Sequence, residues 1–208
     1  GGGTMSGPCG MPQGDDGVSG LIPIALVLEV GDGITLETPT LDDSAELFAV
    51  IDANRAHLRQ WLPWLDGTNT VEDEVGFLKM CADERAAGST AFWAIRENGA
   101  AVGTISLNWI DAQNRGCGVG YWLAADCSGR GIVTRSCARL MDHMFDDVGM
   151  HRFVLEVALE NHASRAIAER LGMRLEGEVK DREWLYDKWV DSALYAITAP
   201  EWKERRGA

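Results

Sequence analysis

The sequence predicts a mixed α/β fold, with one sheet and a single central βαβ crossover, and three observations support it. Asn98-Gly99 joins two apolar, β-rich runs, which is a strong hairpin signal. An amphipathic segment that begins at Ile132 separates two further strand-like runs. Helical patterns otherwise cluster near the N-terminus and do not alternate regularly with strands, which argues against a doubly wound sheet. A chain of 208 residues suits one domain.

Residues 1–20 are rich in Gly, Pro, Ser and Asp and offer almost nothing to bury, so we expect a disordered tail outside the fold. Gly1–Thr4, which precede Met5, resemble a cloning remnant. We therefore assign residues 21–208 to a single domain.

Hydrophobic periodicity predicts the elements that follow this tail. A Gly-Asp-Gly turn separates two β-branched runs, and Thr40 with Asp43 three residues later is an N-cap signature for a first helix. Acids in the first turn of a segment that starts at Thr70 and stops at Gly88 predict another helix. The predicted elements are strands at 24–30 and 34–37 and helices at 40–51, 56–65 and 70–88.

The second half of the chain contains mostly strand patterns. Gly116, Gly118 and Gly120 lie within one of them, where they indicate a bulge or a close backbone approach more than a dinucleotide-binding turn. Gly172 closes a short helix. The predicted elements are strands at 90–97, 101–108, 116–123, 152–159, 173–181 and 186–197, a helix that begins at 132 and a helix at 161–171.

Charge and composition narrow the range of partners. The net charge is −13, so the average surface repels nucleic-acid backbones and anionic membranes and favours cationic partners. No run approaches the roughly 20 apolar residues of a membrane-spanning helix. We therefore expect neither a nucleic-acid partner nor a membrane partner. The five cysteines are scattered without a C-x-x-C pair, which predicts reduced thiols in a cytoplasmic protein.

Several common catalytic motifs are absent from the sequence. It lacks the G-x-S-x-G elbow, the H-E-x-x-H zinc motif and the P-loop pattern, and its four histidines lack metal-ligand spacing. These absences argue against a triad hydrolase, a zinc hydrolase and a classical nucleoside triphosphatase, and we expect no metal site.

The most informative segment is 121–135, which reads as a strand, a glycine-bearing turn and a helix N-terminus. Gly129 and Gly131 expose backbone N–H groups at the positive end of the helix, and such an arrangement binds a pyrophosphate without a P-loop lysine. Arg130 adds positive charge. The alternative is an ordinary strand-to-helix connection.

This segment resembles the acetyl-CoA loop of the GNAT acyltransferase superfamily, and segments in family order at 54–64, 120–123, 161–173 and 181–191 resemble its ribosomal-protein N-acetyltransferase branch, the RimJ/RimL type. The resemblance implies a mostly antiparallel sheet with helices on both faces and a central βαβ unit that binds acetyl-CoA or another short acyl-CoA. The residues implied in cofactor binding are Trp122, Leu123, Ser128, Gly129, Arg130, Gly131, Ile132, Val133, Thr134, Asn161 and Ser164. Ser128 and Val133 depart from the family pattern, which has a glutamine and a small residue there.

The resemblance also implies direct transfer from acyl-CoA to a primary amine within a ternary complex. Such a reaction needs a base for the amine, a donor to the thioester oxygen and a donor to the departing thiolate. The corresponding groups are Glu183, the backbone amides of Trp122 and Leu123, and Ser164. From the residues alone, Glu183 is equally a solvated acid at a strand end, Ser164 a serine in a first helical turn and Asn161 an N-cap.

Trp61 and Trp64 are expected to line the acceptor site together with Glu183, although large aromatic residues usually belong to the core. The expected acceptor is the amine of a protein N-terminus or of a cationic small molecule, and the sequence does not choose between them. It also leaves open a homodimer. A non-catalytic acyl-CoA-binding or regulatory domain is the alternative function.

Overall fold

The computed structural model describes residues 23–207, so the tail predicted for residues 1–20 lies outside the described part of the chain. The strands are β1 (Val27–Gly31), β2 (Ile34–Glu37), β3 (Ala91–Glu97), β4 (Ala100–Asp111), β5 (Gly116–Leu123), β6 (Arg152–Ala158), β7 (Arg174–Leu185) and β8 (Lys188–Thr198). The α-helices are α1 (Ser44–Ala53), α2 (Arg55–Arg59), α3 (Val71–Ala86), α4 (Ile132–Asp142), α5 (His162–Arg170) and α6 (Ala199–Gly207).

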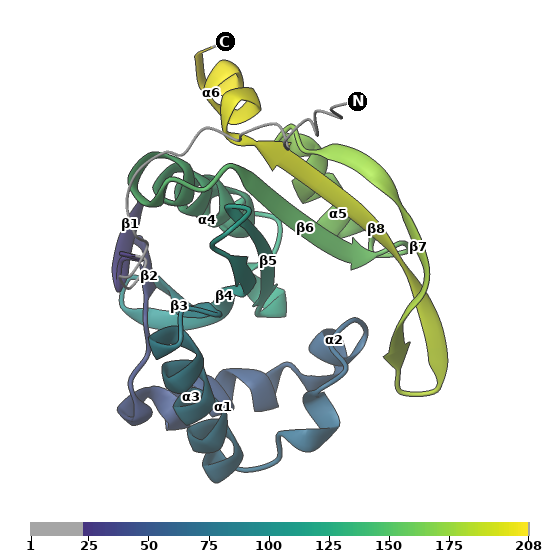
Figure 1. Ribbon diagram of the computed structural model, residues 1–208. Coiled ribbons are helices and arrows are strands. Elements are labelled where there is room, and N and C mark those ends of the chain that lie inside the picture. The colour runs from purple at the N-terminus through teal and green to yellow at the C-terminus, as the bar shows by residue number, and fades with distance from the viewer. Residues whose placement is uncertain (1–22, 208) are drawn as a thin grey trace, which may run out of the picture.

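The eight strands form one sheet in the order β1-β2-β3-β4-β5-β6-β8-β7 (Figure 1). Within the described residues, neighbouring strands are antiparallel except for β5 and β6, which are parallel and joined through α4. This arrangement confirms the predicted central βαβ crossover in a mostly antiparallel sheet.

Helices cover both faces of this sheet, because successive residues of a strand point to opposite sides. In β3, Ala94 packs with Leu47 of α1 and Leu78 of α3. Trp93 and Ile95 point the other way, into the main core that also contains the buried face of α4. Figure 1 shows α1, α2 and α3 on one side of the sheet and α4 on the other. The predicted placement of helices on both faces is confirmed.

β5 and β6 pair along only part of their length. The last pair joins Val119 to Leu155. Beyond it, β5 continues to pair with β4, and β6 continues to pair with β8. The two strands therefore diverge (Figure 1) and open the sheet between their C-terminal ends.

The glycines of β5 allow side chains of β4 to lie directly over the strand. A Cβ atom on Gly118 would lie 2.1 Å from Nε1 of Trp109, and one on Gly120 would lie 2.4 Å from Nδ2 of Asn108. The predicted close approach is thus confirmed. An accompanying register shift lies in β4, between Leu107 and Trp109.

The structure differs from the sequence-based prediction at several places, including the end of β7, which continues past residue 181 to Leu185. The helix predicted over 56–65 ends at Arg59, and the chain then turns through Pro63, whose ring nitrogen has no N–H for a helical bond. The first strand begins at Val27 instead of residue 24. Helix α6 is absent from the prediction because Trp202 is its one buried residue and leaves no apolar period to detect.

Candidate functional site

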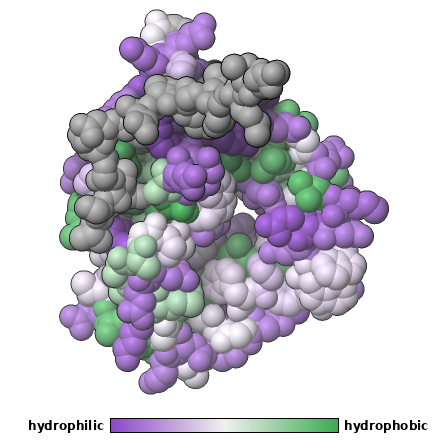
Figure 2. Space-filling view, in the orientation of Figure 1, coloured by the Kyte–Doolittle hydropathy of each residue, from purple (hydrophilic) through white to green (hydrophobic). Residues whose placement is uncertain are grey.

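A cleft of about 1280 Å³ opens where β5 and β6 diverge. Figure 2 shows a hollow between the side of the molecule formed by α1–α3 and the β7–β8 hairpin. All the predicted site residues except Arg130 line the cleft, namely Trp61, Trp64, Trp122, Leu123, Ser128, Gly129, Gly131, Ile132, Val133, Thr134, Asn161, Ser164 and Glu183. The fold therefore brings segments that are far apart in the sequence to one place.

The glycine-bearing loop presents free backbone N–H groups to this cleft. Gly129 and Gly131 have φ angles of +81° and +74°, and a Cβ at either position would meet no protein atom within 4 Å. The first helical bond of α4 runs from the N–H of Arg135 to the carbonyl of Gly131, at 3.0 Å. Within the described chain, the N–H groups of residues 132–134 have no backbone acceptor. Such N–H groups at the positive end of a helix form an anion site.

The side chain of Arg130 lies outside the cleft. Its guanidinium forms two hydrogen bonds with the carboxylate of Glu97, at 2.6 and 3.1 Å. The guanidinium of Arg135 is similarly paired with Asp32, at 2.8 Å. The positive potential of the anion site therefore comes chiefly from the main-chain amides and the helix dipole, and less from the arginines.

The divergence of β5 from β6 also leaves a backbone amide facing the cleft. Val119 is the last residue of β5 that pairs with β6, and the direction of backbone groups alternates along a strand. The N–H of Leu123 therefore faces the same edge as that of Val119, where β6 has moved away. Ala124 donates its N–H to Val102 in β4 at 2.8 Å, which places the N–H of Trp122 on the β4 side as well. Leu123 thus presents its amide to the cleft, and Trp122 its side chain.

Asn161 and Ser164 lie at the start of α5, next to the diverging end of β6. The side-chain oxygen of Asn161 accepts the N–H of Ser164 at 3.3 Å, so Asn161 is the N-cap of this helix. The Ser164 side chain lines the cleft beside the hydroxyl of Tyr121. That hydroxyl is buried. The hydroxyl of Ser164, a half-buried residue that lines the cleft, is therefore the one available to a ligand at this point.

Glu183 reaches the cleft from the opposite wall. It follows a register shift in β7 that begins at Val179. Burial raises the pKa of its carboxyl group above the ordinary value, and the charge of Glu156 raises it further, while Arg182 opposes the shift. A half-buried carboxylate with a raised pKa is a stronger base than an exposed one, which is a property of general bases in active sites.

Tyr186, at the turn of the β7–β8 hairpin, is hydrogen-bonded to the segment that carries Trp61 and Trp64. Its hydroxyl donates to the carbonyl of Leu62 and accepts the N–H of Leu65, the latter at 3.3 Å. The guanidinium of Arg59 lies 3.7 Å from the centre of the Tyr186 ring and is also bonded to Asp66. These contacts hold the segment that carries Trp61 and Trp64 against the hairpin that carries Glu183.

Sequence analysis did not identify the residues that α3 contributes to the cleft. Glu74 and Phe77 both line it. Glu74 shares the buried face of α3 with Leu78. The signal in the sequence is that Glu74, an acid, stands where the helical pattern of α3 would place an apolar residue.

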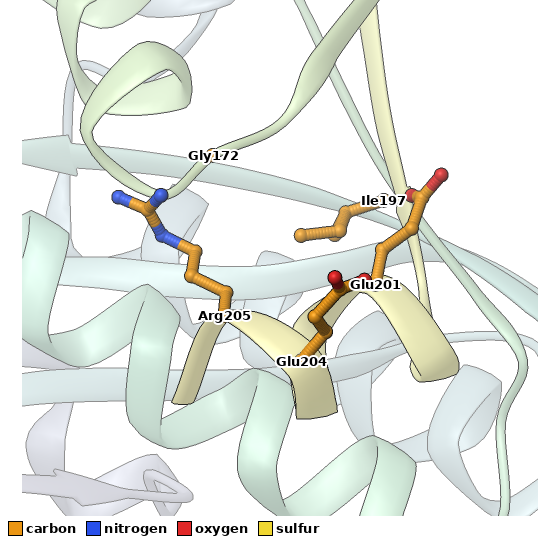
Figure 3. Close-up of a pocket in the computed structure, with 5 residues that line it drawn as sticks. All are labelled: Gly172, Ile197, Glu201, Glu204 and Arg205. Atoms are coloured by element: carbon orange, nitrogen blue, oxygen red, sulfur yellow. The ribbon is translucent and has the colours of Figure 1, made fainter. Parts of the chain in front are cut away.

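A second pocket, of about 540 Å³, lies beside α6 (Figure 3). Its lining residues are Gly172, Ile197, Glu201, Glu204 and Arg205. Arg205 donates to the carbonyl of Arg170, and Glu201 accepts the N–H of Thr198. Since these polar groups serve the backbone and none of the predicted site residues lines the pocket, we do not include it in the candidate site.

Residues 23–207 contain no group of three or more His, Cys, Asp or Glu side chains that could hold a metal ion. In the same range, no helix is both long enough and apolar enough to cross a membrane.

Comparisons with known proteins agree with this geometry. The ribosomal-protein-serine acetyltransferase of Escherichia coli strain K12 is 28% identical over 169 residues, which cover 81% of this chain and 94% of that protein. A crystal structure of the microcin C7 self-immunity acetyltransferase in complex with acetyl-CoA and AMP is 30% identical, with a TM-score of 0.79, and the match covers 81% of this chain and 94% of that one. RimL, a ribosomal L7/L12 α-N-protein acetyltransferase solved with coenzyme A, is 27% identical, with a TM-score of 0.80 over 83% of this chain and 97% of that one.

The match to a protein family covers most of the sheet and the glycine-bearing loop. Residues 34–174 match the acetyltransferase (GNAT) domain family. This range includes α4, whose N-terminus forms the anion site, and the first turn of α5, which carries Ser164. The chain therefore belongs to the GNAT family of acetyltransferases.

Proposed function

We propose that this protein transfers the acetyl group of acetyl-CoA to a primary amine by direct attack within a ternary complex. One observation carries the proposal. The glycine loop with its free amides, Ser164 and Glu183 all line the same cleft. One end offers an anion site, the middle offers hydrogen-bond donors, and the far wall offers a base.

The residues of the cleft fit acetyl-CoA, which supplies an activated thioester. The amides of Gly131 and residues 132–134 suit its diphosphate, because they are unpaired and open to the cleft. The gap between β5 and β6 suits the pantetheine chain, whose amides can pair with the carbonyl of Leu123 at the free edge of β5 and with Asn161. Tyr121, whose hydroxyl is buried, lines the same cleft. Two solved relatives carry acetyl-CoA or coenzyme A.

The proposal assigns one group of the cleft to each of the three needs of the reaction. Glu183 takes the proton of the amine, directly or through a water molecule, because burial raises its pKa and makes its carboxylate a stronger base. The N–H of Leu123 stabilises the thioester oxygen as negative charge develops there. Ser164 donates its hydroxyl proton in a hydrogen bond to the departing thiolate.

The acceptor is expected to be a cationic amine. The net charge of −13 attracts such molecules. Relatives include an enzyme for a ribosomal protein and a self-immunity enzyme solved with AMP, so a protein N-terminus and a small-molecule amine are both acceptors of the proposed kind. We place the protein in the cytoplasm, where its four described cysteines, all free, stay reduced.

The test is release of free thiol from acetyl-CoA over a panel of peptide and small-molecule amines. The variant Glu183→Gln removes the base, and Glu178→Gln is its matched control, since Glu178 is an exposed acid of the same strand outside the cleft. We expect turnover by the wild type and by Glu178→Gln and its loss in Glu183→Gln. Binding of coenzyme A without thiol release for any amine would instead support a non-catalytic acyl-CoA-binding domain.

A further inference from the structure

Glu74 is a buried acid on the face of α3 that packs toward the sheet. It is 4% exposed, although carboxylates are rarely buried without a partner. Its own helix offers no reason for this, because Glu72 and Asp73 in the same turn point to solvent. The carboxyl group of Glu74 lines the cleft.

Four acidic residues line the cleft, and they differ in whether their carboxyl groups have a hydrogen-bond or ion-pair partner. They are Glu74, Glu84, Glu156 and Glu183. Glu84 accepts a hydrogen bond from the hydroxyl of Thr90 at 3.0 Å. Glu156 is paired with Arg182 at 2.6 Å. Glu183 and Glu74 have no hydrogen bond or ion pair with any described side chain. Glu183 is assigned to the reacting amine, which leaves Glu74 without a partner.

The cleft that Glu74 lines also contains aromatic residues. Phe77 lies one turn further along α3, and Trp61 and Trp64 line other parts of the same cleft. Burial raises the pKa of Glu74 to about 7 because no neighbouring cation compensates the charge. Aromatic faces attract cations, and a buried carboxylate gains most from a cation that it can bond directly. The position of Glu74 therefore favours a positively charged group, and no described side chain supplies one to its carboxyl.

We propose that Glu74 binds a second cationic group of the acceptor, so that preferred acceptors carry an ammonium or guanidinium group in addition to the amine that is acetylated. The inference rests on the proposed function, since it assigns the amine near Glu183 to the reaction. Glu74 in α3 and Glu183 in β7 line the same cleft, so the proposal requires one extended acceptor that contacts both acids. The second charge can come from a basic side chain near a protein N-terminus or from a diamine.

The test compares acceptors that differ by one charge. The panel pairs α,ω-diamines of increasing length with monoamines of equal length, and peptides with lysine at the second or third position with the same peptides carrying norleucine. Each pair is assayed by thiol release from acetyl-CoA with the wild type, Glu74→Gln and Glu72→Gln. Glu72 is the matched control because it is an exposed acid of the same helical turn and does not line the cleft.

We expect kcat/KM of the wild type to favour the doubly charged member of at least one pair by about 10-fold or more, the effect of one charge-assisted hydrogen bond. Glu74→Gln should reduce this preference to within about threefold, while Glu72→Gln should keep it. Binding of coenzyme A to Glu74→Gln, measured by calorimetry, checks that the variant is folded.

Three outcomes would overturn the inference while leaving the proposed function intact. The wild type shows no preference in any pair, Glu74→Gln keeps the preference, or Glu74→Gln lowers kcat equally for both members of a pair. The third outcome would place Glu74 at the reacting amine itself. If no amine releases thiol although coenzyme A binds, the proposed function fails, and this inference fails with it.

Discussion

Replacing Gly131 with alanine tests the anion site at the start of α4. The φ angle of +74° at this position costs an alanine about 1–2 kcal/mol of stability. The new methyl group would meet no protein atom within 4 Å, at a residue that lines the cleft. If the diphosphate lies on the amides of residues 132–134 as proposed, this methyl group would crowd it. Loss of one charge-assisted hydrogen bond, about 1.5–3 kcal/mol, weakens binding of coenzyme A by roughly 10- to 150-fold.

Gly149→Ala is the matched control for this variant. Gly149 also has a positive φ, +86°, with no atom within 4 Å of its missing Cβ, but it does not line the cleft. Urea unfolding should show a similar loss of stability in both variants. Calorimetry with coenzyme A should show weaker binding only in Gly131→Ala. Unchanged affinity in Gly131→Ala, or an equal loss in both variants, would refute the assignment of the diphosphate to this loop.

Glu183→Gln is expected to lower kcat by about 10²- to 10⁴-fold without changing the affinity for coenzyme A, because the amide cannot accept a proton. Since burial raises the pKa of Glu183 and the base must be ionised, kcat/KM of the wild type should rise with pH through that pKa, and a rise of equal size in the variant would exclude Glu183 as the base. Ser164→Ala should lower kcat by roughly 10-fold in steady-state thiol release and change the affinity for coenzyme A by less than about twofold. Equal losses in both quantities would assign Ser164 to binding alone. Hydrogen bonds from Arg152 and Arg174 lower the pKa of Glu176 to about 2 from its ordinary 4.5, so the carboxylate stabilises the fold above pH 4.5. The free energy of unfolding of Glu176→Gln in urea should therefore be lower than that of the wild type at pH 7, and the difference should shrink as the pH falls toward 2.

Local signals predicted much of the sheet. Asn98 and Gly99 both adopt positive φ angles, 50° and 87°, as a tight hairpin turn requires, and that requirement made the hairpin detectable. Thr70 accepts the N–H of Asp73 and caps α3, and the acids in the first turn predicted a helix that starts at this residue. Helix α6 gave no such signal, since its stability depends on tertiary contacts of Trp202, which packs in the main core and donates to Asp142 at 2.8 Å.

The candidate site was predictable where its parts are local. The glycine loop needs only a short run of sequence, and the structure places Gly129 and Gly131 at the expected helix N-terminus. Arg130 lies in the same loop, between the two glycines. Its side chain pairs with Glu97 of β3, a partner that no local sequence pattern reveals. The hydrogen bonds of Tyr186 to the segment around Leu65 join residues more than 100 positions apart and likewise depend on the complete fold.

The proposed function depends on binding of the coenzyme A diphosphate by the main-chain amides at the start of α4. A crystal structure of the complex with coenzyme A tests it most directly. We predict diphosphate oxygens about 2.7–3.2 Å from the N–H nitrogens of Gly131 and residues 132–134, with the pantetheine chain between β5 and β6. Coenzyme A bound with its diphosphate elsewhere, and with these amides left to solvent, would contradict the account.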